Sequence, residues 1–392
     1  MPNNWKTYNI GDVATLQRGF DLPNSKRKNG AFPVIAASGF ISWHNVFKVK
    51  GPGVTTGRSG SLGQVFYVEK DFWPLNTSLW VKDFHNNEPR FIYYFLKTIN
   101  FEEFNSGTSV PTLNRNDVHS LEVNIPDLPE QKAIASILSA IDDKIENNLA
   151  INKTLEDMVR ALYKHWFEDF GPFKDSEFID SELGRIPNGW EVKSIKELGK
   201  VVCGKTPSKK KSEYYSSSIY PFIKIPDMHG NVWVLNTNEG LSEEGNNSQL
   251  NKLLPSGSIN VSCIATVGLV SMNIYRSHTN QQINSIIPEN DEHRYFIYLS
   301  MINLKETFLN EASGGSATLN MNTSTFSNID LIKPNEEVLL EFHKAVIHSF
   351  EQIKNNQIEN QTLTHLRDTL LPKLISGEVR LKEFREQMET LL

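Results

Sequence analysis

The sequence predicts a mixed α/β fold in which a globular domain followed by one long helix occurs twice. Three observations predict it: an internal repeat, two long apolar stripes with helical spacing, and short strand-like segments ahead of each stripe. The chain has 392 residues, which suits two or three domains of roughly 100–200 residues each. A hydrophobic content of 39% and a charged content of 22% exclude disordered and fibrous proteins.

The internal repeat consists of matching residues at slowly drifting offsets. At an offset of 185, the residues that recur are Trp5, Ile10, Val13 and Gly19, as Trp190, Ile195, Leu198 and Gly204. At offsets of 206–208, the matched segments are 106–109 with 313–316, Leu113-Asn114 with Leu319-Asn320, Ile125-Pro126 with Lys333-Pro334, 145–148 with 353–356, and 152–155 with 360–363. The drift indicates a duplication with pseudo-twofold character, whose second copy carries an insertion.

Each copy divides into a domain and a helix. The predicted boundaries are a first domain at 1–128, a first long helix at 129–169, a linker at 170–185, a second domain at 186–335, a second long helix at 336–376 and a C-terminal tail at 377–392. Segments 64–68 and 258–261 alternate with turn residues, which predicts strands within the domains. Pro129 and Pro334 stand beside the two helix starts, where proline is favoured.

The two long helices carry apolar residues at alternating steps of three and four, the spacing of a coiled-coil seam. The seam positions are 134, 137/138, 141, 145, 155, 158/159, 162 and 166, then 339, 342, 346, 350, 353, 363, 366, 370 and 374. Asparagine, which fixes register when buried, interrupts both seams at Asn148, Asn152, Asn356 and Asn360. We expect an antiparallel coiled coil that separates the domains by a spacer of roughly 60 Å. The alternative is two amphipathic helices that pack only on their own domains.

The net charge of −6 is unevenly distributed. Residues 1–128 carry 13 basic and 11 acidic side chains, and residues 186–335 carry 13 of each. The acidic surplus therefore lies in the helices, the linker and the tail. A pI near 6.0 argues against DNA binding by the chain as a whole, because phosphate contacts need Lys and Arg, but not by the two domains.

Basic residues cluster in both domains among glycine, serine, threonine and tyrosine, which suits phosphate contacts and base-edge readout. The same runs can also be solvated loops. The candidate DNA-binding residues are Arg18, Lys26, Arg27, Lys28, Arg58, Ser59 and Arg115 in the first domain, and Lys205, Thr206, Ser208, Lys209, Lys210, Lys211 and Lys224 in the second.

Two motifs that resemble catalytic sites are rejected. Residues 199–206 match the phosphate-loop pattern G-x-x-x-x-G-K-[ST], which works only between a strand and a helix. Pro207 follows directly and disfavours helix at Thr206, so we expect no ATP binding there. Asp127 with Glu130 and Lys132 superficially resembles a nuclease set, whose carboxylates would come from separate strands. No C-x-x-C or H-E-x-x-H spacing occurs, and we assign no catalytic or metal-binding residue.

The compartment follows from three features of the chain. The N-terminus has no apolar signal core, and no apolar run reaches the roughly 20 residues of a membrane span. The cysteines number two, Cys203 and Cys263, which suits a reducing environment. We expect a cytoplasmic protein that does not contact a membrane.

Several motifs together point to one family. They are 128–135 (Leu-Pro-Glu-Gln-Lys-Ala-Ile-Ala) opening the first helix, Leu155-Glu156 and 164–167 closing it, 370–378 ending the second helix, and 57–63, 204–207 and 223–228 in the domains. Over essentially the whole chain the sequence resembles a specificity (S) subunit of a type I restriction-modification enzyme.

The resemblance implies two target recognition domains, each reading one half of an asymmetric bipartite site in double-stranded DNA, with the coiled coil setting the gap. It also implies two adenine-N6 methyltransferase (M) subunits and a restriction/translocase (R) subunit as partners. The chain itself is then expected to be non-catalytic and to bind no cofactor, with S-adenosylmethionine, ATP and Mg on the partner subunits. The alternative is a scaffold, or an orphan or anti-restriction relative, that docks M subunits without binding DNA.

Overall fold

The computed structural model describes residues 5–107, 110–312 and 319–380. The chain forms two compact units, residues 1–146 with 361–392 and residues 147–360. Each unit therefore combines one globular domain with a part of both long helices. Of the matched segments, 313–316 lies outside the described residues, and 106–109 lies partly outside them, as does the predicted tail at 377–392.

The first unit is built on two small sheets and a strand pair. Its elements are β1 (Lys6–Asn9), α1 (Ile10–Val13), β2 (Thr15–Arg18), β3 (Phe32–Ala36), β4 (Gly39–His44), β5 (Gly53–Gly57), β6 (Val65–Val68), β7 (Trp73–Pro74), β8 (Ser78–Asp83), α2 (Pro89–Lys97), α3 (Arg115–His119), β9 (Glu122–Ile125) and the first part of α4 (Leu128–Phe167). The strand orders are β2-β8-β5-β6 and β4-β3-β7, with β1 paired to β9. Glycine-rich turns between short strands explain the small size of the sheets.

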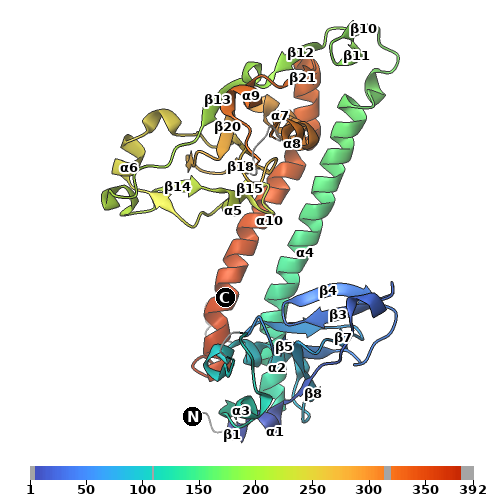
Figure 1. Cartoon of the computed structure of the whole chain (residues 1–392), viewed down its shortest axis with the longest axis vertical. Coiled ribbons are helices and arrows are strands. Elements are labelled where there is room, and N and C mark those ends of the chain that lie inside the picture. The colour runs from blue at the N-terminus through green and yellow to red at the C-terminus, as the bar shows by residue number, and fades with distance from the viewer. Residues whose placement is uncertain (1–4, 108–109, 313–318, 381–392) are drawn as a thin grey trace, which may run out of the picture. The chain divides into compact units, whose positions relative to one another are not determined.

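The second unit repeats this plan with additions (Figure 1). Its elements are β10 (Phe178–Ser181), β11 (Gly184–Pro187), β12 (Glu191–Ser194), β13 (Gly199–Cys203), β14 (Tyr220–Ile223), α5 (Ile225–Met228), β15 (Trp233–Val234), β16 (Gly240–Leu241), α6 (Glu243–Asn247), β17 (Ile259–Ser262), β18 (Val270–Asn273), β19 (His278–Thr279), β20 (Ile283–Pro288), α7 (Arg294–Asn303), α8 (Lys305–Ala312), α9 (Thr323–Ser327), β21 (Asp330–Lys333) and the first part of α10 (Glu336–Ser376). The strand orders are β13-β20-β17-β18-β15 and β16-β14-β19, with β12 paired to β21.

Apart from β15 and the β10–β11 hairpin, the two units share one topology. The order β13-β20-β17-β18 reproduces β2-β8-β5-β6, and β16-β14-β19 reproduces β4-β3-β7, including the parallel pairing of the last two strands. The first strand pairs agree in register, because Lys6 lies opposite Ile125 and Glu191 lies opposite Lys333. The predicted fold class, mixed α/β with an internal repeat and two long antiparallel helices, is confirmed.

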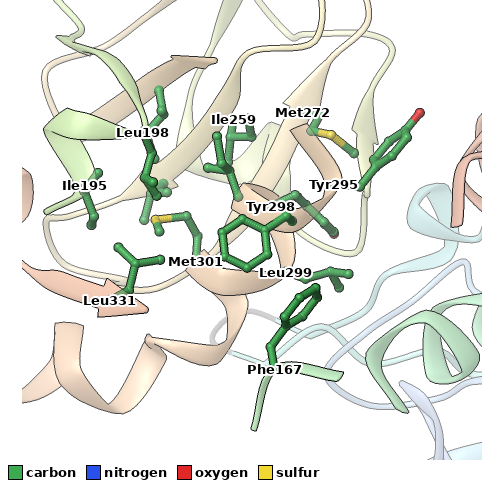
Figure 2. Packing of buried hydrophobic residues seen from close by; sticks show 14 of the residues in the cluster. Phe167, Ile195, Leu198, Ile259, Met272, Tyr295, Tyr298, Leu299, Met301 and Leu331 are labelled. Carbon is green, nitrogen blue, oxygen red and sulfur yellow. The ribbon is translucent and has the colours of Figure 1, made fainter. Parts of the chain in front are cut away.

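Each unit has its own hydrophobic core, formed between the sheet and the helices. In the second unit, α7 supplies Tyr295, Tyr298 and Leu299, which pack with Phe167 from α4 and Ile259 from β17 (Figure 2). Burial of such large side chains is worth roughly 1.5–3 kcal/mol each. The long helices are therefore part of both domain cores, which the seam pattern alone does not show.

The long helices begin at matched caps. The Asp127 carboxylate accepts a hydrogen bond from the Glu130 N–H at 3.2 Å, and the Asn335 side chain accepts one from the Val338 N–H at 3.0 Å. A side-chain oxygen at this position satisfies a backbone donor that the helix leaves open. The helices then run 40 and 41 residues. Within the described part of the chain, neither these nor any other helix is long and apolar enough to cross a membrane.

In each unit the two helices run antiparallel. In the first unit, Arg367 of α10 forms an ion pair with Asp142 of α4 at 2.9 Å, and Leu138 lies in the same core as Leu371. In the second unit, Phe167 near the end of α4 packs on Phe342 near the start of α10. The alternative in which each helix packs only on its own domain is therefore wrong.

Two predicted seam positions are solvent-exposed. Leu366 is 44% exposed, and Met158, which was one of two choices at its position, is 59% exposed. Val159, the other choice, is buried at 4%. The strict spacing rule fails here because a straight helix drifts relative to a seven-residue repeat.

The segment predicted as a linker contains secondary structure. Residues 171–173 form a short 3-10 helix, and strands β10 and β11 pair antiparallel as a hairpin. Strand β11 extends to Pro187, beyond the predicted boundary at 185. The rings of Phe170 and Phe173 pack against Trp190, so this segment packs on the second domain.

Candidate nucleic-acid interface

A glycine turn after β2 opens the candidate interface of the first unit. The Gly19 N–H donates to the Ser78 carbonyl at 3.1 Å, and the Phe20 N–H donates to the Pro74 carbonyl at 2.8 Å. A Cβ atom at Gly19 would lie 2.1 Å from the Leu75 oxygen, so no side chain fits there. The glycine is required because two backbone segments meet at this point.

The second unit repeats this turn after β13. The Gly204 N–H donates to the Ile283 carbonyl at 3.0 Å, and the Lys205 N–H donates to the Thr279 carbonyl at 2.9 Å. A Cβ atom at Gly204 would lie 2.2 Å from the Asn280 oxygen. The match between Gly19 and Gly204 found in the sequence therefore has a structural cause.

A second loop follows β5 in the first unit. The Arg58 N–H donates to the Thr77 carbonyl at 2.8 Å, and the Arg58 carbonyl accepts from the Leu113 N–H at 2.8 Å. The Gly60 N–H donates to the Pro111 carbonyl at 3.0 Å. These bonds bring the segments around residues 20, 58, 76 and 112 to one end of the domain.

The corresponding loop follows β17 in the second unit and was missed by the sequence analysis. The Cys263 N–H donates to the Gln282 carbonyl at 2.8 Å, and the Cys263 carbonyl accepts from the Met321 N–H at 2.9 Å. The Ala265 N–H donates to the Leu319 carbonyl at 3.0 Å. Leu113 therefore corresponds to Met321, and the sequence match of Leu113-Asn114 with Leu319-Asn320 is wrong by two residues.

The two loops also share unusual backbone angles. Gly60 has φ of 92° and Ala265, at the same place, has φ of 64°; Gly63 and Gly268 have 81° and 84°. A non-glycine residue in the left-handed region costs roughly 1–2 kcal/mol. Only the glycine at 268, 205 residues after Gly63, could have revealed the second loop from the sequence. In each unit we call the glycine turn and the loop, with the backbone bonds that the two units share, the loop frame.

The structure brings some of the first-domain candidates together. An Arg18 Nη lies 3.8 Å from an Asp21 carboxylate oxygen, and an Arg58 Nη donates to the Asn76 carbonyl at 3.2 Å. Both arginines therefore border the loop frame. Ser59 lies in the same loop, opposite Thr112.

The other first-domain candidates are placed differently. Lys26 ends a short 3-10 helix, Arg27 donates to the Leu22 carbonyl at 3.5 Å, and the Lys28 N–H donates to His44. Of these three residues, Lys28 therefore lies beside β4 of the small sheet. Arg115 is the exposed first residue of α3.

In the second unit the candidates form two groups. Lys205 and Thr206 lie in the loop frame, where the Thr206 hydroxyl donates to Gln281 Oε1 at 2.6 Å. Lys209 and Lys224 instead converge on the carboxylate of Glu239. The hydrogen bond from Lys224 is the largest cause of a lowered Glu239 pKa.

The positive charge of the lysine run at 209–211 is thus partly neutralised. The Lys211 ammonium donates to the Tyr214 hydroxyl at 3.0 Å and lies over its ring. Ser208 and Lys210 are exposed; the Ser208 carbonyl accepts from the Lys211 N–H at 3.1 Å, and the Lys210 ammonium makes no hydrogen bond or ion pair with any residue that the structure describes. A surface hollow of about 500 Å³ lies beside this run, lined by Lys209, Ser212, Tyr215, Ser218 and Asn238 to Gly240.

The two rejected motifs have structural explanations. Residues 199–203 form strand β13, paired antiparallel with β20, and the next helical turn begins only at Ser212. Asp127 is the cap of α4, and Gln131 is buried with its amide donating to the Pro126 carbonyl and to Asn87. In the described residues, no group of three or more His, Cys, Asp or Glu side chains could hold a metal ion.

The four asparagines of the helices form two hydrogen-bonded layers in the second unit. Asn356 donates to Asn152 Oδ1 at 2.8 Å, and Asn148 donates to Asn360 Oδ1 at 2.9 Å. Asn148, Asn152 and Asn356 are buried. Each layer joins α4 to α10, so a shift of either helix by one turn would separate the partners.

Comparison with known proteins places the chain. The sequence profile of the type I restriction modification DNA specificity domain matches twice, at residues 2–157 and 187–366. The chain belongs to this family. Among its relatives, the type I restriction enzyme HindI specificity subunit of Haemophilus influenzae is 35% identical over 96% of this chain and all of the relative. The MjaIX specificity subunit of Methanocaldococcus jannaschii is 28% identical over 98% of this chain and 95% of the relative.

The specificity family also has this fold. A crystal structure of a type I restriction-modification system S subunit from M. genitalium superposes with a TM-score of 0.67, at 17% identity, over 96% of this chain and 97% of that one. The predicted membership of the S-subunit family is confirmed. The two profile matches coincide with the two copies of the repeat.

Proposed function

We propose that this specificity-family chain reads a bipartite site in double-stranded DNA, with one half-site contacted by each globular domain. The observation that carries the proposal is the loop frame, which occurs once in each unit with the same backbone bonds and different side chains. A constant frame with variable exposed side chains suits readout of two different short sequences, because base-edge contacts specify sequence while the backbone positions them. The chain is then non-catalytic.

The distribution of charge supports this assignment of roles. The two domains are neutral or slightly basic, whereas the helices, linker and tail hold the acidic surplus. Long-range attraction to phosphate is therefore weak, and we propose that the chain grips DNA fully only together with partner subunits. Those partners would be two M subunits and one R subunit, which would carry S-adenosylmethionine, ATP and Mg.

Exposed apolar side chains on the long helices support docking of protein partners there. In the second unit, Leu149, Ile151, Met158 and Ile358 are 38–59% exposed. Asp157 is next to Met158 and Glu359 is next to Ile358, so charged residues border part of this surface, as at protein interfaces with a polar rim. We propose that the M subunits cover this surface.

The helices would also set the gap between the half-sites. The pairings Asn148–Asn360 and Asn152–Asn356 define which residues face each other. Residues 143–149 of α4 therefore oppose residues 359–365 of α10. Deleting both segments removes one heptad from each helix, preserves the seam, and shortens the pair by about 10 Å, or roughly three base pairs.

The test is to co-express the deletion variant with its M subunits and map methylated adenines. We expect both half-sites to be unchanged and the gap to be about three base pairs shorter. The matched control replaces the same two segments with unrelated heptads of equal length, which should keep the original gap. An unchanged gap in the deletion variant would refute the spacer role. Methylation that depends on this chain but shows no sequence preference would instead favour the scaffold alternative.

A further inference from the structure

The loop frame aligns four side-chain positions of the first domain with four of the second. In the first domain they are Arg18, Asp21, Arg58 and Asn76, and in the second they are Cys203, Thr206, Cys263 and Gln281. The alignment rests on matched backbone bonds at or on both sides of three positions, and on those that precede Asp21 and Thr206. Both cysteines of the chain thus stand where the first domain has arginine.

One side-chain pair of this set, the second position with the fourth, is in contact in both domains. The Asn76 amide donates to the Asp21 carboxylate, and the Thr206 hydroxyl donates to Gln281 Oε1 at 2.6 Å. The carbonyls of these residues are approached from different positions, that of Asn76 by an Arg58 Nη at 3.2 Å and that of Gln281 by the Cys203 thiol at 4.0 Å, although Cys203 aligns with Arg18. The contact shared by the two domains is therefore the one between the second and fourth positions, made with different side chains in each domain.

Several of these side chains reach solvent, whereas that of Cys263 is buried in the core. The Arg18 and Asp21 side chains are 52% and 73% exposed, and Gln281 is exposed. The frame beneath them is held by backbone bonds and by glycine, which do not depend on side-chain identity. Exposed and mutually oriented polar groups on a rigid backbone are the arrangement that sequence readout needs.

We infer that these positions form the base-reading set of each domain, with guanidinium groups in the first domain and a threonine-oriented amide in the second. This inference rests on the proposed function and names the groups that would perform it. Arginine pairs with the O6 and N7 acceptors of guanine, and glutamine pairs with N6 and N7 of adenine. The first half-site would therefore contain a guanine read by Arg18 or Arg58, and the second an adenine read by Gln281.

The cysteines limit the second set to two side chains. Cys263 is buried, with its thiol 3.2 Å from the Asn284 amide nitrogen, and Cys203 turns toward backbone carbonyls. Neither thiol presents a strong donor to DNA. Thr206 and Gln281 therefore carry the readout in the second domain, whereas all four positions are polar in the first.

The test uses the full chain in complex with its M subunits, with methylated adenines mapped for each variant. Gln281→Ala should relax one base of one half-site by roughly tenfold or more and leave the other half intact. The double variant Arg18→Ala with Arg58→Ala should relax only the other half-site. Gln281→Arg should shift the preference at the affected base from adenine to guanine.

Matched controls separate readout from general binding. Asn251→Ala removes an exposed amide elsewhere in the second domain, and Lys82→Ala removes an exposed cation elsewhere in the first; neither should change the site. If the unmodified chain gives a bipartite site and the frame variants leave both halves unchanged at an unaltered melting temperature, the inference is overturned while the proposed function stands. An unmodified chain that directs no bipartite methylation would overturn the proposed function itself.

Discussion

Asn356 donates a side-chain hydrogen bond to Asn152 at 2.8 Å, and both residues are buried between α4 and α10. A buried amide that loses its partner retains an unsatisfied polar group, which costs free energy. Replacement of both amides leaves no such group and avoids this cost. The pair therefore links the stability of the helices to their alignment.

We expect Asn356→Leu alone to lower the free energy of unfolding by about 1–3 kcal/mol, because the buried Asn152 Oδ1 loses the N–H donor that Asn356 supplies. Adding Asn152→Leu should restore much of this loss while weakening the definition of register. Urea denaturation of the single and double variants measures both effects. Asn355→Leu, the same change at an exposed neighbour, should be nearly neutral, and a double variant less stable than either single variant would contradict the argument.

A methyl group at Gly204 should destabilise the second unit. The new Cβ would lie 2.2 Å from the Asn280 oxygen and 2.4 Å from the Thr279 oxygen, which are fixed backbone atoms. We expect Gly204→Ala to cost about 1–3 kcal/mol or more, as overpacking does. Differential scanning calorimetry should show a lower melting temperature than for Lys205→Ala, the exposed neighbour. Equal melting temperatures would mean that the loop frame adapts easily.

Lysine substitutions should affect DNA binding unequally along the 209–211 run. Lys209 and Lys211 already interact with Glu239 and Tyr214, whereas Lys210 makes no such contact within the described residues. We expect Lys210→Ala to lower affinity and to reduce the slope of log K against log salt by roughly 0.9, the value for one phosphate contact.

Replacement of all three lysines should weaken binding further and flatten the salt dependence more. Fluorescence anisotropy with M subunits present measures affinity and slope together. Lys174→Ala, an exposed lysine of the linker segment, serves as the control and should leave the slope unchanged. Unchanged affinity and slope in the triple variant would remove this run from the interface.

His278 should make the second unit sensitive to mild acid. The ring is fully buried, with Nε2 3.0 Å from Asn246 Oδ1, and burial lowers its pKa to about 4. The unfolded chain has a pKa near 6.5 at this residue, so protons bind the unfolded state first as the pH falls. The stabilisation is complete above about pH 6.5 and declines toward pH 4, by roughly 2 kcal/mol between pH 7.5 and pH 5.

The measurement is urea unfolding at several pH values for the natural chain and for His278→Asn. The difference in stability between pH 7.5 and pH 5 should be smaller in the variant. His229→Asn, at an exposed histidine of the same unit, should keep the pH dependence of the natural chain. Identical pH profiles for the natural chain and His278→Asn would rule out this histidine as the source.

The helices were predictable because their signals are local. Asp127 and Asn335 cap them, proline flanks both starts, and the apolar spacing runs through each, so the observed bounds differ from the predicted ones by at most two residues. The exposure of Leu366 was not predictable, because it depends on how the two helices cross rather than on either sequence.

The candidate interface was only partly predictable. Gly19 and Gly204 stand out because no other residue fits, but Cys263 and Gln281 join the interface through backbone bonds to distant segments that leave no sequence pattern. The neutralisation of Lys209 and Lys224 by Glu239 has the same origin, since these residues are far apart in the chain. Non-local contacts therefore set the limit of what the sequence could indicate.

The loop frame has an evolutionary consequence. Its geometry is set by main-chain hydrogen bonds, so point changes at its exposed side chains, such as Arg18, Asp21 and Gln281, alter the surface without endangering the fold. After a gene duplication, two identical domains diverge through such changes into two domains that recognise different DNA sequences. New specificities would then arise in small, individually tolerated steps, with each domain free to drift independently of its twin.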